Sequence, residues 1–324
     1  MKLLTPGFWQ QSPPSRAARL LSPLGVLYGG ITRRRMQRAG ADAGCPVICI
    51  GNFTAGGAGK TPLTLLVGEI LATQGRKPFF LSRGYGGTAG RGPLRVDPAC
   101  HGAGEVGDEP LLLAALAPVI VGADRVAAAR LAVALGADVL VMDDGLQNPS
   151  LAKTFSFAVV DGEVGAGNGL CLPAGPLRAP LAAQWPYVDG VVIIGAGDSG
   201  AALASSAMAA GKQVFLGRLA ANADDAAQLR GQRVVAFAGI GRPAKFFATL
   251  AEIGAQLVAQ HEFADHHVFS SAELAALQAQ AQALQARLVT TRKDQVRLGQ
   301  AGSEILALRV KLVLENSFPE TPGA

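Results

Sequence analysis

The sequence from residue 51 to residue 62 reads Gly51-Asn52-Phe53-Thr54-Ala55-Gly56-Gly57-Ala58-Gly59-Lys60-Thr61-Pro62. The apolar residues 46–50 precede this stretch, and residues 63–71, which have the apolar spacing of a helix, follow it. A strand, a glycine-rich turn and a helix in this order are typical of a phosphate-binding loop. In such a loop, successive backbone N–H groups and the positive end of the helix dipole surround phosphate oxygens. The stretch therefore predicts an α/β fold that binds a nucleotide.

The predicted nucleotide contacts are consecutive residues of this loop, Thr54, Ala55, Gly56, Gly57, Ala58, Gly59, Lys60 and Thr61. In this motif Lys60 reaches the β- and γ-phosphates, and the hydroxyl of Thr61 is a ligand of Mg²⁺. The sequence departs from the usual pattern at Thr54, which stands where the first glycine is expected. An accidental glycine-rich helix cap is the alternative interpretation, but the flanking strand and helix are the context that the motif requires.

The length of the chain, 324 residues, predicts about two domains. From residue 46 onward, apolar runs of strand length alternate with segments of helical pattern, which favours a mostly parallel sheet with helices on both faces. The polar, glycine-rich residues 88–107 are expected to form a mobile loop. Buried strands are expected at residues 78–82, 118–121, 139–142, 157–160 and 191–194, and helices at 111–117, 124–135, 201–210 and 272–286.

A second strand–turn–helix pattern begins near Arg233 and predicts a smaller α/β unit. The β-rich segments 213–219 and 305–314 flank this unit, and we expect them to pair as a two-stranded connection. The expected organisation is an N-terminal membrane-surface region (1–38), a domain around the phosphate loop (39–212), a β linker (213–232), a smaller α/β domain (233–304), and a returning linker strand with a tail (305–324).

The N-terminal region combines an apolar segment with a cluster of arginines. Residues 17–31 are mostly apolar, but Arg19 and Pro23 interrupt them, and they are fewer than the roughly 20 residues of a membrane-spanning helix. Arginines follow at positions 33, 34, 35 and 38. This pattern fits a helix that lies on an anionic membrane surface. A helix docked on the protein, with a solvated arginine run, is the alternative.

Composition limits the choice of partners and compartment. The net charge is only +5, so the chain shows no strong signal for a nucleic-acid partner, and we expect none. The four cysteines lack the spacing of a disulfide framework, which indicates reduced thiols in a cytoplasmic protein. The sequence does not identify a protein partner.

Two adjacent acids, Asp143 and Asp144, follow the apolar residues 139–142. The end of a buried strand downstream of a phosphate loop is where an acid must lie to hold Mg²⁺ beside the phosphates. Two acids at a strand end are costly unless a cation or hydrogen-bond donors satisfy them. We therefore predict that Asp143, Asp144 and Thr61 form the metal site, with an exposed Asp-Asp-Gly turn as the alternative.

Asp108 and His266 are candidates for proton transfer. Asp108 opens a predicted helix, where it could simply cap the helix, but an enzyme that phosphorylates a hydroxyl also needs a group that accepts its proton. His266 lies in the segment His261-Glu262-Phe263-Ala264-Asp265-His266-His267, in which a zinc site is unsupported because no cysteine is near. A histidine in a turn and a histidine paired with a carboxylate both remain open. Residues this distant in the chain would meet only across a cleft between the domains.

A series of motifs follows in a fixed order along nearly the whole chain. The motifs are residues 51–62, Leu81-Ser82-Arg83-Gly84-Tyr85-Gly86-Gly87, Gly107-Asp108-Glu109-Pro110, Asp143-Asp144-Gly145-Leu146-Gln147, Pro173-Ala174-Gly175-Pro176-Leu177-Arg178, Phe263-Ala264-Asp265-His266-His267 and Thr291-Arg292-Lys293-Asp294, with Ser22-Pro23-Leu24-Gly25 and Leu27-Tyr28 near the N-terminus. Together they resemble the tetraacyldisaccharide 4'-kinase family of lipid A synthesis.

The resemblance implies a kinase that uses ATP and Mg²⁺ at the cytoplasmic face of the inner membrane of a Gram-negative bacterium. Its acceptor is the 4'-hydroxyl of a tetraacylated glucosamine disaccharide 1-phosphate, a glycolipid. By similarity, Asp108 is the general base with help from His266, Lys60 and Arg178 neutralise phosphate charge, and Gln147 is a supporting polar group. Many family members have a glutamate after the arginine of the Pro-Leu-Arg motif, whereas this chain has Ala179.

Two other classes share a related phosphate loop. A membrane-associated switch ATPase of the partitioning or division-site type carries a signature lysine just before the paired glycines, but this chain has Ala55 there. A cofactor-biosynthesis synthetase would leave the apolar and basic residues 1–38 without a role. The kinase is therefore the interpretation that the sequence favours.

Overall fold

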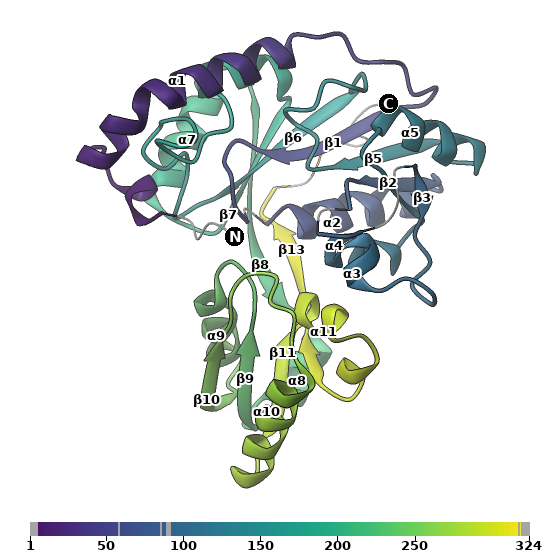
Figure 1. Ribbon diagram of the computed structural model, residues 1–324, viewed down its shortest axis with the longest axis vertical. Helices are drawn as coiled ribbons and strands as arrows, with labels where there is room; N and C mark the ends of the chain where they lie inside the picture. Colours follow the sequence, from purple (N-terminus) through teal and green to yellow (C-terminus); the bar gives the residue numbers. More distant parts are fainter. Residues whose placement is uncertain (1–5, 58, 85, 89–91, 317, 319–324) are drawn as a thin grey trace.

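The computed structural model describes residues 6–57, 59–84, 86–88, 92–316 and 318. These residues form two α/β units, each built on its own sheet. Figure 1 shows the larger unit above the smaller one, with strands β8 (Gln213–Ala221) and β13 (Val310–Leu314) at the connection between them. The two strands pair antiparallel, which confirms the predicted pairing for residues 310–314. Residues 306–308 instead form a strand of the smaller sheet.

The larger sheet has β1 (Val47–Asn52) in its interior, in the order β13-β8-β7-β6-β1-β5-β2-β4-β3. β1 pairs in parallel with β5 on one side and with β6 on the other. The chain builds the β5 side first and then crosses to β6, and ligands of open parallel sheets bind beyond the carboxyl ends of the strands at such a switch point. The other strands are β2 (Pro78–Ser82), β3 (Leu94–Arg95), β4 (Val119–Val121), β5 (Val139–Asp143), β6 (Phe155–Asp161) and β7 (Gly190–Ile194).

Helices cover both faces of this sheet, as predicted, because successive strand residues point apolar side chains to opposite faces. On one face, Ile48 and Ile50 of β1 share a core with Leu63 of α2 (Lys60–Thr73). On the other face, one cluster includes α5 (Arg125–Ala134) and another includes α7 (Asp198–Ala209). The remaining helices of this unit are η1 (Gly7–Gln10), α1 (Arg16–Met36), α3 (Ala103–Val106), α4 (Asp108–Ala114), α6 (Leu181–Gln184) and η2 (Trp185–Tyr187).

The smaller sheet is parallel, in the order β10-β9-β11-β12. Phe246 and Leu250 of α9 pack in one core cluster, which Leu229 of α8 also joins, and Leu274 and Leu277 of α10 pack in another. α8 therefore packs with the smaller unit, although it lies within residues 213–232. The elements are α8 (Ala223–Leu229), β9 (Arg233–Ala238), α9 (Pro243–Glu252), β10 (Gln256–Glu262), α10 (Ser271–Ala283), β11 (Arg287–Thr291), α11 (Arg292–Leu298), η3 (Gly299–Gly302) and β12 (Leu306–Leu308).

Helix α1 packs on the larger unit through small residues and exposes large apolar ones. A Cβ atom at Gly25 would lie 2.7 Å from the carbonyl oxygen of Cys171, and one at Gly29 would lie 2.8 Å from the Cys171 sulfur, so only glycine allows this close approach. The opposite side of α1 exposes Leu20, Leu24, Leu27 and Ile31, which follow helical spacing. Within the described residues, no helix is long and apolar enough to cross a membrane.

The expectation about the segment before α4 is wrong. Residues 88–107 are not an irregular loop throughout, because β3 pairs antiparallel with β4 and residues 103–106 form α3; residues 89–91 lie outside the described residues. The next helix, α4, begins at Asp108, where a helix was expected to open, but it ends at Ala114 and not at residue 117. The preceding Gly107 has a φ of 91°, which is accessible to glycine and lets the chain turn directly from α3 into α4.

The two units contact each other at places other than the paired strands. Arg242, at the start of α9, forms ion pairs with Asp161, the last residue of β6, and with Glu163 just after it, and Lys245 Nζ lies 2.8 Å from Asp161 Oδ2. Helix α11 of the smaller unit contacts α4 of the larger one. Figure 1 shows α11 at the end of the smaller unit that faces the larger one. Residues of both units can therefore meet at the carboxyl edge of the larger sheet.

Candidate active site

The phosphate loop connects the central strand β1 to α2, as the sequence predicts. Gly59 precedes the helix with a φ of 83°, a left-handed conformation that glycine adopts without strain. The Asn52 side-chain amide donates to the carbonyl oxygen of Gly56 at 3.2 Å, which ties the loop to the end of β1. Ala58, a predicted nucleotide contact, lies outside the described residues. Lys60 and Thr61 begin α2, so both side chains stand beside the loop.

The structure also gives a reason for Thr54 in place of the first glycine. Thr54 forms an antiparallel bridge with Leu177, and the N–H of the next residue, Ala55, donates to the carbonyl oxygen of Pro176 at 2.7 Å. An extended bridge suits a β-branched residue and does not require a positive φ. The Pro-Leu-Arg motif therefore supports the start of the loop through the backbone, in addition to carrying Arg178.

Lys60, Asp144 and Arg178 form one charged group beside the loop. Lys60 Nζ lies 3.6 Å from Asp144 Oδ1, and Arg178 Nη1 donates to the same oxygen at 3.0 Å. Burial alone would raise the pKa of Asp144, but the charges of Lys60 and Arg178 outweigh it and lower that pKa. Asp144 has a φ of 52°, a conformation that is uncommon for a residue other than glycine. Two cations and one carboxylate leave a net positive site, which suits a polyphosphate.

Asp143 is the more deeply buried acid, only 2% exposed. Burial, with the negative charges of Glu109 and Asp144, raises the pKa of Asp143 to about 7. Its Oδ1 lies 3.3 Å from the hydroxyl of Thr64 on α2. A buried carboxylate of this kind gains stability when a cation is bound beside it.

The oxygen atoms that the site offers suit Mg²⁺ better than a metal ion that is held by protein ligands alone. In the part of the chain that the structure describes, no group of three or more His, Cys, Asp or Glu residues has metal-ligand spacing. Mg²⁺ commonly binds one or two carboxylates and completes its coordination with phosphate oxygens and water. Asp143, Asp144 and Thr61, gathered at the carboxyl ends of β1 and β5, are oxygen donors of the required type.

Asp108 and His266 meet across the two units. His266 Nδ1 lies 3.0 Å from Asp108 Oδ2, although the residues are 158 positions apart. The hydrogen bond to Asp108 is the main reason why the pKa of His266 is raised. Burial would raise the pKa of Asp108, but the hydrogen bond and charge of His266, with the charges of Lys293 and Arg297, hold it at about 2. The carboxylate–histidine pair, which the sequence left open, is therefore present.

Three further residues lie at the site, although none of them was predicted from the sequence to have a role there: Glu109, Lys293 and Arg297. The Thr61 hydroxyl donates to Glu109 Oε1 at 3.3 Å, and Lys293 Nζ donates to the same oxygen at 2.7 Å. Arg297 Nε lies 3.5 Å from Asp108 Oδ2. Glu109 and Lys293 belong to motifs that carry the family resemblance, and this was the only sign in the sequence that they could lie at the site. Nothing in the sequence indicated such a position for Arg297. Because Glu109 contacts Thr61 and directly follows Asp108, it places the Asp108–His266 pair next to the phosphate loop.

Gln147 and Ala179 share a buried hydrogen-bond network below the site. Gln147 Nε2 donates to the carbonyl oxygen of Asn52 at 2.8 Å and to Gln184 Oε1 at 2.9 Å. Gln184 Nε2 in turn donates to the carbonyl oxygen of Ala179 at 2.7 Å. Ala179 itself is fully buried. Gln147 thus holds the end of β1, while the alanine side chain packs in the protein interior.

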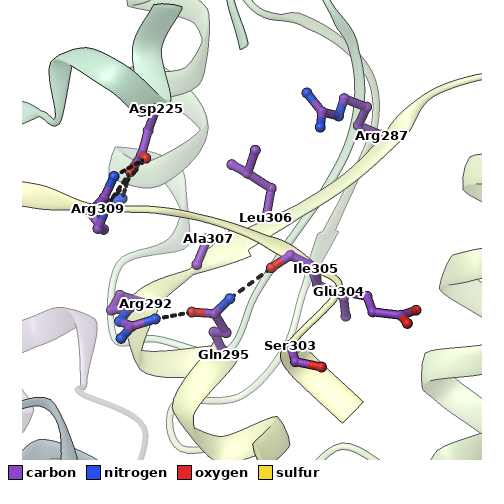
Figure 2. Close-up of a pocket in the computed structure, with 10 residues that line it drawn as sticks. All are labelled: Asp225, Arg287, Arg292, Gln295, Ser303, Glu304, Ile305, Leu306, Ala307 and Arg309. Carbon is purple, nitrogen blue, oxygen red and sulfur yellow. Dashed lines mark hydrogen bonds and ion pairs between the residues drawn. The ribbon is translucent and has the colours of Figure 1, made fainter. Parts of the chain in front are cut away.

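A separate cavity of about 410 Å³ lies in the smaller unit, and Figure 2 shows its lining. None of the predicted site residues lines it. Several of its polar groups satisfy one another: Arg309 pairs with Asp225 at 2.7 Å, and Arg292 donates to Gln295, which donates to the carbonyl oxygen of Ile305 at 2.8 Å. This cavity is therefore separate from the predicted site at the carboxyl edge of the larger sheet.

The parallel sheet with its switch point at β1, the phosphate loop and the paired acids at the end of β5 define a class of protein, the P-loop nucleotide-binding proteins. Comparisons with known proteins identify the family. The model of the family described as tetraacyldisaccharide-1-P 4'-kinase, LpxK, matches residues 17–321. The chain belongs to this family.

Individual relatives agree with the family model. A tetraacyldisaccharide 4'-kinase of Methylobacterium radiotolerans is 58% identical over 313 residues, covering 96% of this chain and 95% of that protein. One of Rhodopseudomonas palustris is 48% identical over 314 residues, with 96% and 92% coverage. The crystal structure of LpxK from Aquifex aeolicus in complex with ATP has the same fold, with a TM-score of 0.72 and 24% identity over 92% of this chain and 95% of that chain. The resemblance seen in the sequence is confirmed, and the switch-ATPase alternative is not favoured.

Proposed function

We propose that this protein transfers the γ-phosphoryl group of ATP to the 4'-hydroxyl of a tetraacylated glucosamine disaccharide 1-phosphate, in lipid A biosynthesis. The observation that carries the proposal is the meeting of Asp108 and His266, 3.0 Å apart, beside the phosphate loop. A nucleotide switch needs the loop and the metal acids only, whereas a kinase also needs a group that takes a proton from its acceptor.

Each residue then has one role in the reaction. Lys60 and Arg178 neutralise phosphate charge, and backbone N–H groups of the loop after Ala55, whose own N–H is bonded to Pro176, orient the phosphates. Asp143, Asp144 and Thr61 would hold Mg²⁺, which would stabilise charge on the transferred group and its leaving oxygen. Asp108 accepts the hydroxyl proton, and His266 orients Asp108 and shares that proton. Gln147 supports the end of β1 below the loop.

We also propose that α1 binds the cytoplasmic surface of the inner membrane of a Gram-negative bacterium. Leu20, Leu24, Leu27 and Ile31 expose an apolar stripe, with fractions between 56% and 82%. Arg33, Arg34 and Arg35 lie in the last turn of the same helix, where they would meet anionic headgroups. The glycine side of α1 packs on the segment around Cys171, which leads to Arg178, so an acceptor in the bilayer would lie near the site.

The direct test is transfer of labelled γ-phosphate from ATP by the purified protein to the disaccharide lipid in mixed micelles. We expect labelled lipid that depends on Mg²⁺, and no label on an acceptor whose 4'-hydroxyl is replaced by hydrogen. ATP hydrolysis without labelled lipid, stimulated instead by a protein or DNA, would contradict the kinase proposal and favour a switch ATPase.

Replacing Leu20, Leu24, Leu27 and Ile31 together by glutamine is expected to weaken binding to liposomes by roughly 100-fold or more, because each side chain loses apolar burial in the bilayer. The apparent KM for lipid should rise while nucleotide binding stays unchanged. Liposome flotation and steady-state kinetics measure both effects. The matched control replaces Leu135 and Met208, which are exposed outside α1, by glutamine. Equal binding by the stripe variant and the control would rule out α1 as the membrane contact.

A further inference from the structure

The buried side chain of Arg297, from α11, lies beside the carboxylate–histidine pair. Its side chain is only 7% exposed, and its Nε lies 3.5 Å from Asp108 Oδ2. On its other side, Nη2 lies 3.0 Å from Oδ1 of Asp294, which is fully buried on the same helix. Arg297 therefore forms a bridge from a carboxylate of its own unit to a carboxylate of the other unit.

The same guanidinium group also contacts the backbone around His266. Arg297 Nη1 donates to the carbonyl oxygen of Gly239 at 2.8 Å and to that of His267 at 3.4 Å. The N–H of His266 donates to the Gly239 carbonyl oxygen at 3.0 Å, and the Gly239 N–H donates to Asp294 Oδ1 at 3.1 Å. His266 has a φ of 57°, a conformation that surrounding contacts must hold for a residue with a side chain.

We propose that Arg297, supported by Asp294, is a positioning residue for phosphoryl transfer, which fixes the carboxylate of Asp108 and the turn carrying His266 in one arrangement. This inference rests on the proposed roles of Asp108 and His266. A planar guanidinium with several fixed donors can hold a carboxylate and two carbonyl oxygens at once, which an ammonium group cannot do with the same geometry.

The charges around the pair predict how it responds to loss of Arg297. The groups that act on it are Lys293 and Arg297 from α11, Asp265 beside His266, Glu109 next to Asp108, and Asp294 behind Arg297. The charge of Arg297 lowers the pKa of both Asp108 and His266. Removing the charge of Arg297 would therefore raise both pKa values. The pair would then bind its proton more tightly and would need a higher pH to act as a base.

The test compares pH profiles of kcat for Arg297→Gln, Arg297→Lys and Arg292→Gln. For Arg297→Gln we expect kcat to fall roughly 10- to 100-fold through misplacement of the pair, and the acidic limb of the profile to move up by about one pH unit. In Arg297→Lys the acidic limb of the pH profile should return to its wild-type position, because the charge is kept, but kcat should recover only in part. Arg292→Gln removes an exposed charge from the same helix and should behave as the wild type.

A double variant separates catalysis from folding. Arg297→Gln alone leaves Asp294 buried without its cation, which can destabilise the protein, whereas Asp294→Asn with Arg297→Gln removes both charges. We expect the double variant to regain most of the lost Tm and to keep the shifted limb. An unshifted limb in both variants, or a kcat that recovers fully with Tm, would overturn the positioning role.

The same assay distinguishes failure of this inference from failure of the proposed function. If Asp108→Asn and His266→Ala lose activity while Arg297→Gln keeps the wild-type profile, only the inference about Arg297 is wrong. If Asp108→Asn and His266→Ala both retain wild-type kcat, the proposed pair itself is wrong, and the role of Arg297 falls with it.

Discussion

Asp108→Asn is expected to lower kcat by roughly 10²–10⁴-fold, the range for loss of a positioned acid or base. Asparagine keeps the size of the side chain but cannot accept the proton of the acceptor hydroxyl. Because Asp108 contacts His266 and Arg297 and not the phosphate loop, ATP affinity should change little. Steady-state kinetics with the lipid acceptor and a nucleotide-binding titration measure the two quantities. A variant with near-normal kcat would contradict the assignment of the base.

The kcat of His266→Ala tests the other half of the same carboxylate–histidine pair. Its defect should be smaller than that of Asp108→Asn and should overlap with it, because groups that act as a unit give non-additive effects. The pKa of His266 is raised by Asp108, so the pair holds a proton at mildly acidic pH and loses it as pH rises. Activity should therefore fall as pH drops below the raised pKa of His266. Fully additive losses in the double variant would show that the two residues act separately.

The sequence predicted the features that depend on local pattern. The strand expected at residues 78–82 has those bounds in the structure, and a strand begins at Arg233 where the second unit was expected. The phosphate loop was predictable because strand, turn and helix follow one another within about 25 residues and each has its own periodicity. Asp143 and Asp144 were predictable because they follow a fully apolar strand, and strand ends of a parallel sheet meet at one edge.

Contacts between distant segments had no such local signal. Glu109 and Lys293 are 184 positions apart, and their contact depends on how α11 packs against α4. Arg297 lies in a short helix with a common mixture of charges, so nothing in its spacing distinguishes it from the exposed Arg292. The family resemblance suggested that His266 acts together with Asp108. Only the arrangement of the two units shows that their side chains meet.

Lys60→Ala is expected to lower kcat/KM by roughly 10²–10³-fold, the usual loss when one preorganised charge is removed from a transferring group. Lys60 is only 11% exposed and lies 3.6 Å from Asp144, in the positive group beside the loop. The fold should survive, because Arg178 still contacts Asp144 through two nitrogens. Circular dichroism and thermal unfolding check the fold, and we expect a Tm within about 4 °C of the wild type.

The control for this prediction is Lys77→Ala, which removes the same charge at an exposed position next to the amino end of β2, the opposite edge of the sheet from the loop. It should leave kcat/KM unchanged. Arg178→Gln should cost less than Lys60→Ala, because Lys60 still faces Asp144 in that variant and the loop keeps its cation. A folded Lys60→Ala protein that turns over like the Lys77→Ala control would show that this loop does not bind the transferred phosphate, whatever its sequence.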